Sequence, residues 1–140
     1  KSDLYFAQKK YGSYKINSNS KLFDLKKSQK LYVSNQSNIT RIVGSRSHSN
    51  QSFDSWVNKN FSNTEIVQAG SSLKFCLIAE GVADIYPRFG PTSEWDIAAG
   101  HIIVNEAGGR VNTFENIEIH YNKKEDLLNP QFYAIGNYKL

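Results

Sequence analysis

The chain has 140 residues, of which 39% are hydrophobic and 13% aromatic, so it can form one ordinary domain or part of a larger one. Its net charge of +4 comes largely from lysines in the first 30 residues. No nucleic-acid-binding pattern accompanies them, so a surface that favours anionic ligands is preferred over nucleic-acid binding. The single cysteine, Cys76, excludes an internal disulfide and fits a reducing cytosol. No apolar run approaches the roughly 20 residues of a transmembrane segment.

The first 40 residues predict short, half-buried strands at 3–7, 12–16 and 31–33, separated by polar turns. Such strands cannot enclose a core by themselves, so we expect the edge of a sheet whose other strands lie elsewhere. The start at Lys1 lacks an initiator methionine and a signal-peptide pattern, which favours a fragment over a complete gene product. We therefore predict that residues 1–40 are terminal strands of an incomplete amino-terminal sheet domain. Residues 41–140 are predicted to form a carboxyl-terminal α/β domain.

From residue 41 onward, predicted strands and helices alternate. Strands are expected at 41–44, 64–69, 82–86, 111–114 and 131–135, with Pro87 ending the third of them. Helices are expected at 53–61, from 73 to a stop at Gly81, and from about 93 to Gly108. This rhythm predicts a layered α/β fold.

The last helix carries the candidate metal ligand. Its apolar residues at 95, 98, 99, 102, 103 and 107 predict one stripe that faces the core. Thr92 or Ser93 can cap it, and Asp96 lies in its first turn. Asp96 is either a magnesium ligand or only a charge that complements the helix dipole. Glu94 cannot share the ion, because two residues are about 200° apart around a helix.

The turn from the strand at 64–69 into the next helix is a candidate phosphate cradle. Gly70 and Ser71 offer backbone donors there, and Lys74 adds positive charge. The spacing is not that of a P-loop, and an ordinary helix cap at Ser71 or Ser72 is the alternative. Arg88 follows the strand that Pro87 is predicted to end, and its forked guanidinium suits a phosphate.

Four further residues carry polar chemistry. The loop after the strand at 41–44 contains Ser47 and His48, which suit a polar ligand or simply belong to a surface loop. His101 and His120 are predicted to be structural, because His101 lies beside the apolar stripe of its helix and His120 has no partner at metal-binding spacing.

Several motifs together resemble a known family. The segment WDIAAGHIIVNEAGG at 95–109 resembles the carboxyl-terminal signature of the inositol monophosphatase superfamily. Three more segments are similar to the bacterial 3'(2'),5'-bisphosphate nucleotidases of that superfamily, namely GSRSH at 44–48, GSSLKFCLIAEG at 70–81 and YPRFGPT at 86–92. The resemblance covers about residues 41–135.

The resemblance implies a fold, an activity and a site. The fold would be the carboxyl-terminal half of a layered α/β sandwich of the inositol monophosphatase type. The activity would be magnesium-dependent hydrolysis of the 3'-phosphate of 3'-phosphoadenosine 5'-phosphate, which yields AMP in sulfur assimilation. The enzyme would be cytoplasmic or peripheral at the inner membrane. Position by position, Asp96 corresponds to a metal ligand, and the substrate-binding positions are Ser47, His48, Gly70, Ser71, Lys74 and Arg88.

The chain departs from the family pattern in one respect. The acidic Glu-Glu motif and the Asp-Pro-x-Asp-Gly-Thr-like motif, which supply the other metal ligands, do not occur in it. The catalytic residues are therefore expected upstream, and we expect this chain alone to bind Mg²⁺ weakly and to be nearly inactive. The missing half, or a second copy of the chain, is the expected protein partner. An inositol monophosphatase and a non-catalytic nucleotide-binding module are the alternative functions.

Overall fold

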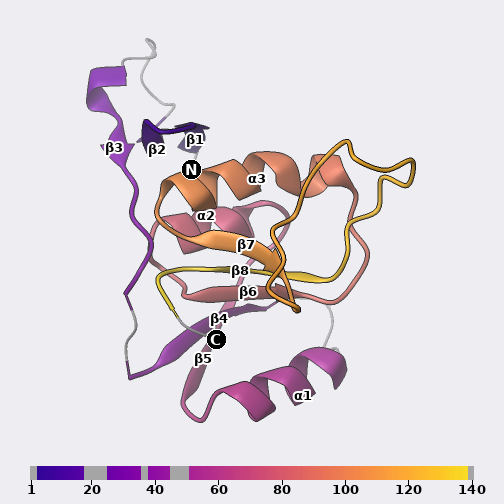
Figure 1. Cartoon of the computed structure of the whole chain (residues 1–140). Coiled ribbons are helices and arrows are strands. Elements are labelled where there is room, and N and C mark those ends of the chain that lie inside the picture. Colours follow the sequence, from indigo (N-terminus) through magenta and orange to yellow (C-terminus); the bar gives the residue numbers. More distant parts are fainter. Residues whose placement is uncertain (1–2, 18–24, 36–37, 45–50, 139–140) are drawn as a thin grey trace.

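The computed structural model describes residues 3–17, 25–35, 38–44 and 51–138, and it shows four layers. A small sheet lies above the helices α2 and α3, a five-stranded sheet lies beneath them, and α1 covers the far face of that sheet (Figure 1). The predicted layered α/β architecture is therefore confirmed. In chain order the elements are β1 (Asp3–Gln8), β2 (Gly12–Asn17), the 3-10 helix η1 (Leu25–Lys27), β3 (Gln29–Lys30), β4 (Thr40–Gly44), α1 (Gln51–Asn60), β5 (Thr64–Gln68), α2 (Leu73–Ala79), β6 (Ile85–Arg88), α3 (Glu94–Glu106), β7 (Arg110–Thr113) and β8 (Phe132–Ile135).

The direction of the strands in the large sheet decides where the functional residues gather. The strand order is β5-β4-β6-β8-β7. The strands β5 and β6 both run parallel to β4, whereas β8 is antiparallel to β6 and to β7. The carboxyl ends of the three parallel strands therefore meet at one edge of the sheet. We call this the carboxyl edge; its described residues are 69–74 and 88–96.

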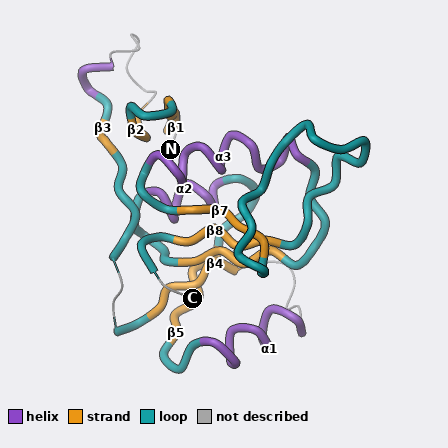
Figure 2. The backbone as a smooth tube through the Cα atoms, viewed as in Figure 1, coloured by secondary structure: helices purple, strands orange, loops and turns teal. Residues whose placement is uncertain are grey.

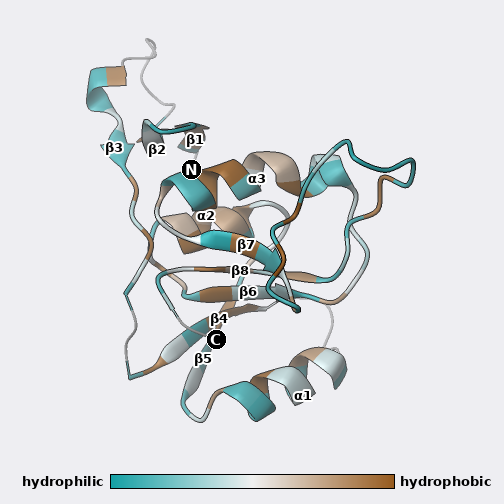
Figure 3. Cartoon of the chain, in the orientation of Figure 1, coloured by the Kyte–Doolittle hydropathy of each residue, from teal (hydrophilic) through white to brown (hydrophobic). Residues whose placement is uncertain are grey.

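Hydrophobic residues fill both faces of the large sheet. One cluster lies between the sheet and α2–α3 and includes Phe75, Ile97 and Phe132. A second cluster lies under α1 and is built around Val57 and Tyr133. The long segment between β7 and β8 is mainly hydrophilic, unlike the strands and helices that form these two clusters (Figure 3). None of the helices in the described ranges is both long and apolar enough to cross a bilayer.

The small sheet is fastened to the helices by polar contacts. The Lys15 ammonium lies 3.0 Å from Glu80, just after α2, and 3.3 Å from Asp3. The Tyr5 hydroxyl also donates to Glu80. Burial and the hydrogen bond to Glu80 raise the pKa of Tyr5 to about 12. The outer edge of β1 has no partner strand among the described residues.

The predicted strand at 31–33 is wrong by two residues, because the short strand β3 is Gln29–Lys30. Leu31 still donates to Ser13 at 2.8 Å, but Val33 donates instead to Ala107, beyond the end of α3. The chain therefore leaves the sheet at this point to run beside the helix layer.

Pro87 does not end a strand as predicted. The strand β6 begins only at Ile85 and continues through Pro87 to Arg88, with Pro87 opposite Tyr133 of β8. On its other side β6 pairs with β4 only at Ile85. A proline without an N–H is tolerated in a strand where no neighbour requires that donor.

The predicted inward stripe of α3 is confirmed only in part, at Ile103 and Ala107, which are buried. Trp95, expected in the core, is 69% exposed. Phe75 of α2 packs directly against Gly100, where an added Cβ atom would lie 2.5 Å from the ring. This close approach turns a partly different face of the helix inward than the one predicted. The buried residues of this face are Ile97, Gly100, His101, Ile103, Val104 and, after the helix, Ala107.

Candidate phosphate and metal site at the carboxyl edge

The carboxyl edge brings together elements that are distant in the sequence. Gly70 and Ser71 follow β5, Arg88 ends β6, and Asp96 lies in the first turn of α3. Lys74 belongs to the first turn of α2, beside the same edge. Of the predicted site residues, Ser47 and His48 lie outside the described residues.

Lys74 is a buried cation without a carboxylate partner. The residue is 6% exposed, and its Nζ atom donates to the Ser71 carbonyl oxygen at 3.3 Å. The same atom lies 5.1 Å from the centre of the Tyr86 ring. No carboxylate of the described residues lies within ion-pair distance of it. Burial, and then the nearby Arg88 guanidinium, lower the pKa of Lys74.

Arg88 is the second cation at this edge. Its Nη2 atom donates to the Pro91 carbonyl oxygen at 3.2 Å. Its Nε atom is buried and has no hydrogen-bond partner among the described residues. A buried donor without a partner is costly. Two neighbouring cations that lack a carboxylate, one of them with a free donor, form a local environment that favours a bound anion.

The turn before α2 contributes little capping. Ser72 occupies the N-cap position but makes no side-chain cap hydrogen bond. Ser71 adopts a left-handed backbone conformation with φ 51°, and its carbonyl oxygen faces Lys74. The Ser72 side chain therefore does not cap the helix, contrary to the alternative interpretation. The hydroxyl groups of this exposed turn stay available to a ligand.

Asp96 is exposed at the beginning of α3. Its Oδ2 atom accepts a hydrogen bond of 2.7 Å from the backbone N–H of Ser93, the N-cap residue. One carboxylate oxygen thus stabilises the helix end, as the simpler interpretation of Asp96 expects. The other oxygen makes no hydrogen bond or ion pair within the described part of the chain and remains free for an ion. Glu94 is buried whereas Asp96 is exposed, so the two carboxylates diverge, as their separation of two residues predicts.

The residues present fit one ligand of a magnesium site. A carboxylate oxygen is the donor type that Mg²⁺ prefers, and Asp96 supplies one. Among the described residues, no three histidine, cysteine, aspartate or glutamate side chains converge on a common point. Asp96 can therefore contribute to a metal site, but these residues cannot complete one.

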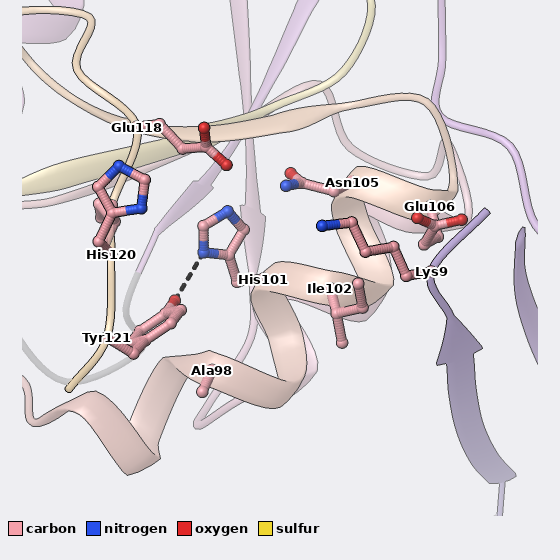
Figure 4. Close-up of a pocket in the computed structure, with 10 residues that line it drawn as sticks. Lys9, Ala98, His101, Ile102, Asn105, Glu106, Glu118, His120 and Tyr121 are labelled. Carbon is pink, nitrogen blue, oxygen red and sulfur yellow. Dashed lines mark hydrogen bonds between the residues drawn. The ribbon is translucent and has the colours of Figure 1, made fainter.

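A separate hollow of about 410 Å³ lies on the flank of α3 and contains none of the predicted site residues. At its base, His101 Nδ1 lies 2.6 Å from the Tyr121 hydroxyl, while Nε2 has no partner among the described residues. Burial lowers the pKa of His101, which keeps the ring neutral. Lys9 and Glu118 point toward the hollow from opposite sides (Figure 4). This confirms that His101 is buried and held by a neighbour, as expected of a structural histidine.

Glu94 was not predicted to have any role. It is a charged residue that the structure buries against the segment between β7 and β8. No pattern in the sequence indicates this, because the group that binds its carboxylate is a backbone N–H rather than a side chain.

Comparisons with known proteins identify relatives over most of the chain. The Inositol monophosphatase family matches residues 1–134. A 3'(2'),5'-bisphosphate nucleotidase CysQ from Buchnera aphidicola is 46% identical over 101 residues, covering 71% of this chain and 38% of that protein. CysQ from Haemophilus influenzae is 32% identical over 136 residues, covering 97% of this chain and 49% of that protein.

A solved structure agrees with these relatives. CysQ from Bacteroides thetaiotaomicron, described as a bacterial member of the inositol monophosphatase family, superposes with a TM-score of 0.85 at 38% identity. It covers 98% of this chain, and this chain covers 55% of it. An inositol monophosphatase from Anabaena, at 20% identity and a TM-score of 0.68, shares the fold. The chain thus spans about half the length of these proteins or less.

Proposed function

Because this chain belongs to the inositol monophosphatase family, we propose that it is the carboxyl-terminal part of a magnesium-dependent phosphatase acting on 3'-phosphoadenosine 5'-phosphate. The products would be AMP and phosphate. The observation that carries this proposal is the pair of cations at the carboxyl edge, Lys74 and Arg88, which have no carboxylate partner in the described structure. The similarity to CysQ nucleotidases supports the choice of substrate.

Each residue then has a role that its chemistry supports. Lys74 and Arg88 hold the phosphate that is not hydrolysed, with Gly70 and Ser71 beside it. Asp96 holds Mg²⁺ through its free carboxylate oxygen, while Ser93 fixes the other. When bound, the ion would screen the phosphate charge and activate water. Ser47 and His48 are proposed to contact the nucleoside.

The number of cations favours this substrate over an inositol monophosphate. One phosphate can be neutralised by the metal site alone, whereas a second phosphate requires additional positive charge elsewhere. Lys74 and Arg88 provide it. A non-catalytic nucleotide-binding module would use the same two cations but would not need Asp96, so the two functions make different demands on that residue.

The two acidic motifs of the family are absent from these residues, so we expect the chain alone to turn over little substrate. Residues 1–40 would be terminal strands of a larger sheet that continues from the open edge of β1. We place the enzyme in the cytoplasm, in sulfur assimilation, with the other half or a second copy of the chain as its protein partner.

Activity can be tested by fusing residues 1–140 to the amino-terminal half of the Buchnera relative. We expect Mg²⁺-dependent phosphate release from 3'-phosphoadenosine 5'-phosphate, and faster turnover of it than of inositol 1-phosphate. Arg88→Gln should raise KM for the bisphosphate about 10- to 100-fold, since a hydrogen bond to a charged group contributes about 1.5–3 kcal/mol. It should hardly change KM for inositol 1-phosphate.

Asp96→Asn and Lys59→Gln complete the experiment. Asp96→Asn should abolish Mg²⁺-dependent turnover, whereas Lys59→Gln, on the exposed end of α1, should behave like the unchanged protein. Faster turnover of inositol 1-phosphate would favour the monophosphatase. Bisphosphate binding without any turnover, unaffected by Asp96→Asn, would favour the non-catalytic module.

A further inference from the structure

The long segment between β7 and β8 holds the beginning of α3 from one side (Figure 2). Three consecutive residues at the helix start are bound to it. Asn129 donates to Thr92 twice, through its backbone N–H at 2.8 Å and its side-chain amide at 3.1 Å. Ser93 pairs with Leu128 in an antiparallel bridge. The backbone N–H of Glu94 donates to the Leu127 carbonyl oxygen at 3.0 Å. We call residues 121–129 the clamp.

The Glu94 side chain also binds the clamp, through a hydrogen bond from Asn122. It is 9% exposed, and its Oε2 atom accepts a hydrogen bond of 2.9 Å from the backbone N–H of Asn122. Its Oε1 atom is buried and has no partner among the described residues. Asn122 adopts a left-handed conformation with φ 55°, which asparagine tolerates better than most residues. A buried carboxylate with one hydrogen bond is unfavourable by itself, so folding alone does not explain it.

The clamp makes a second side-chain contact with the same face of α3, between Tyr121 and His101. The Tyr121 hydroxyl lies 2.6 Å from His101 Nδ1, and the two rings meet edge to face at 5.5 Å (Figure 4). Residues seven apart on a helix lie on nearly the same face, about two turns apart. Tyr121 and Asn122 are adjacent in the chain, so they bind α3 at His101 and at Glu94 simultaneously. The beginning of the helix therefore cannot tilt away from the clamp without straining both contacts, and it cannot fray without breaking the contact at Glu94.

From these contacts we propose that Glu94 is a positioning residue for Asp96, and that it acts through the clamp. Glu94 holds the beginning of the helix against the clamp through Asn122. Ser93, which pairs with Leu128 of the clamp, donates its backbone N–H to Asp96 Oδ2. The free oxygen of Asp96 is thereby held in one orientation. This inference rests on the proposed role of Asp96 as a metal ligand.

Manganese broadening in amide NMR spectra tests this on the 140-residue chain. Mn²⁺ is a paramagnetic substitute for Mg²⁺ and reveals even weak binding. We expect it to broaden the amides of residues 93–97 in the unchanged protein. Glu94→Ala should require about tenfold more Mn²⁺ for equal broadening, as is usual when a residue that supports a metal ligand is removed. Glu94→Gln, which still accepts from Asn122, should restore the response to within about twofold.

The controls separate this inference from the proposed function. Asp96→Asn should remove the broadening; if it does not, the metal role of Asp96 is wrong. If Asp96→Asn removes it but Glu94→Ala does not change it, only the positioning role is wrong. A Glu94→Gln response as weak as that of Glu94→Ala would also overturn positioning, because the charge would then matter instead. Glu125→Ala, exposed on the clamp, should have no effect. If Glu94→Ala does not fold, Tyr121→Phe replaces it, and an unchanged response would overturn the proposal.

Discussion

Two regions of this molecule use buried or half-buried cations in opposite ways. At the amino ends of the strands, Arg41 lies 2.6 Å from Asp84, a carboxylate that is 0% exposed. The carboxylate also accepts from the Arg41 backbone N–H and from Ser34. At the carboxyl edge, Lys74 and Arg88 have no carboxylate within the described structure. The charge of Arg41 is neutralised by Asp84, whereas the charges of Lys74 and Arg88 are not neutralised by any carboxylate of the described residues.

The pKa values follow this difference. Burial opposes the charged form of Asp84, but the hydrogen bonds from Arg41 outweigh it and lower the pKa of Asp84. The hydrogen bond to Asp84 raises the pKa of Arg41. For Lys74 nothing outweighs burial, so its pKa is lowered. A cation whose charged form is disfavoured in the free protein is one that a bound phosphate would stabilise.

The largest expected effect concerns the paired region. Asp84→Ala should lower the free energy of unfolding by about 3–5 kcal/mol, because it leaves the Arg41 guanidinium half-buried without its partner. Denaturant unfolding measures this change. Asp54→Ala, an exposed acid in the first turn of α1, serves as the control and should cost no more than about 1 kcal/mol. A loss as small as this for Asp84→Ala would remove the distinction between the two regions.

The unpaired region should respond in the opposite way. Lys74→Met removes a buried charge that has no ion pair, so the free energy of unfolding should stay within about 1 kcal/mol of the original or rise. Binding of adenosine 3',5'-bisphosphate, measured by calorimetry on the 140-residue chain, should weaken about tenfold. Lys59→Met should change neither quantity. A large loss of stability with unchanged binding would make Lys74 a structural residue.

The smallest expected effect is a pH dependence. Because the pKa of Lys74 is lowered in the free protein, and an anion favours its charged form, bisphosphate affinity should fall as the pH rises through that lowered pKa. The free energy of unfolding should change with pH in the opposite direction to the affinity. The contribution of Lys74 to stability is fully present above its pKa in the unfolded chain and is lost as the pH falls through its lower pKa in the folded protein. Calorimetric titrations at several alkaline pH values measure the affinity.

Lys15 provides the contrast for this measurement. Hydrogen bonds to Glu80, Tyr5 and Asp3 outweigh burial and raise the pKa of Lys15, so it stays charged over the same range. Lys15→Met should therefore leave the pH dependence of binding intact, whereas Lys74→Met should remove it. The same alkaline decline in Lys74→Met would assign it to another group.

The sequence was sufficient to predict the layered fold and most of its elements. The helix at 53–61 was found because Phe53, Trp56 and Val57 recur at helical spacing, and the structure places them toward the sheet. The strands at 41–44 and 131–135 were found because they are apolar and short. The positions of Lys74, Arg88 and Asp96 at one edge follow from the parallel strand order, which the alternation of strands and helices implies.

What could not be predicted depends on contacts between distant segments. The helix α3 contains apolar residues on several faces, so only the packing of Phe75 against Gly100 decides which face is buried. Pro87 remains in its strand because of where β4 stops pairing. The burial of Glu94 depends on a backbone N–H from Asn122, and such donors carry no signature in a sequence. The roles of the individual site residues remain predictions.

The contact between Phe75 and Gly100 has a meaning beyond packing. Lys74 immediately precedes Phe75 on α2, and Asp96 lies one helical turn before Gly100 on α3. The contact between the two helices therefore fixes the distance between Lys74 and Asp96. Because residue 100 is a glycine, the helices lie close together, and this spacing would determine the size of a ligand that reaches both residues.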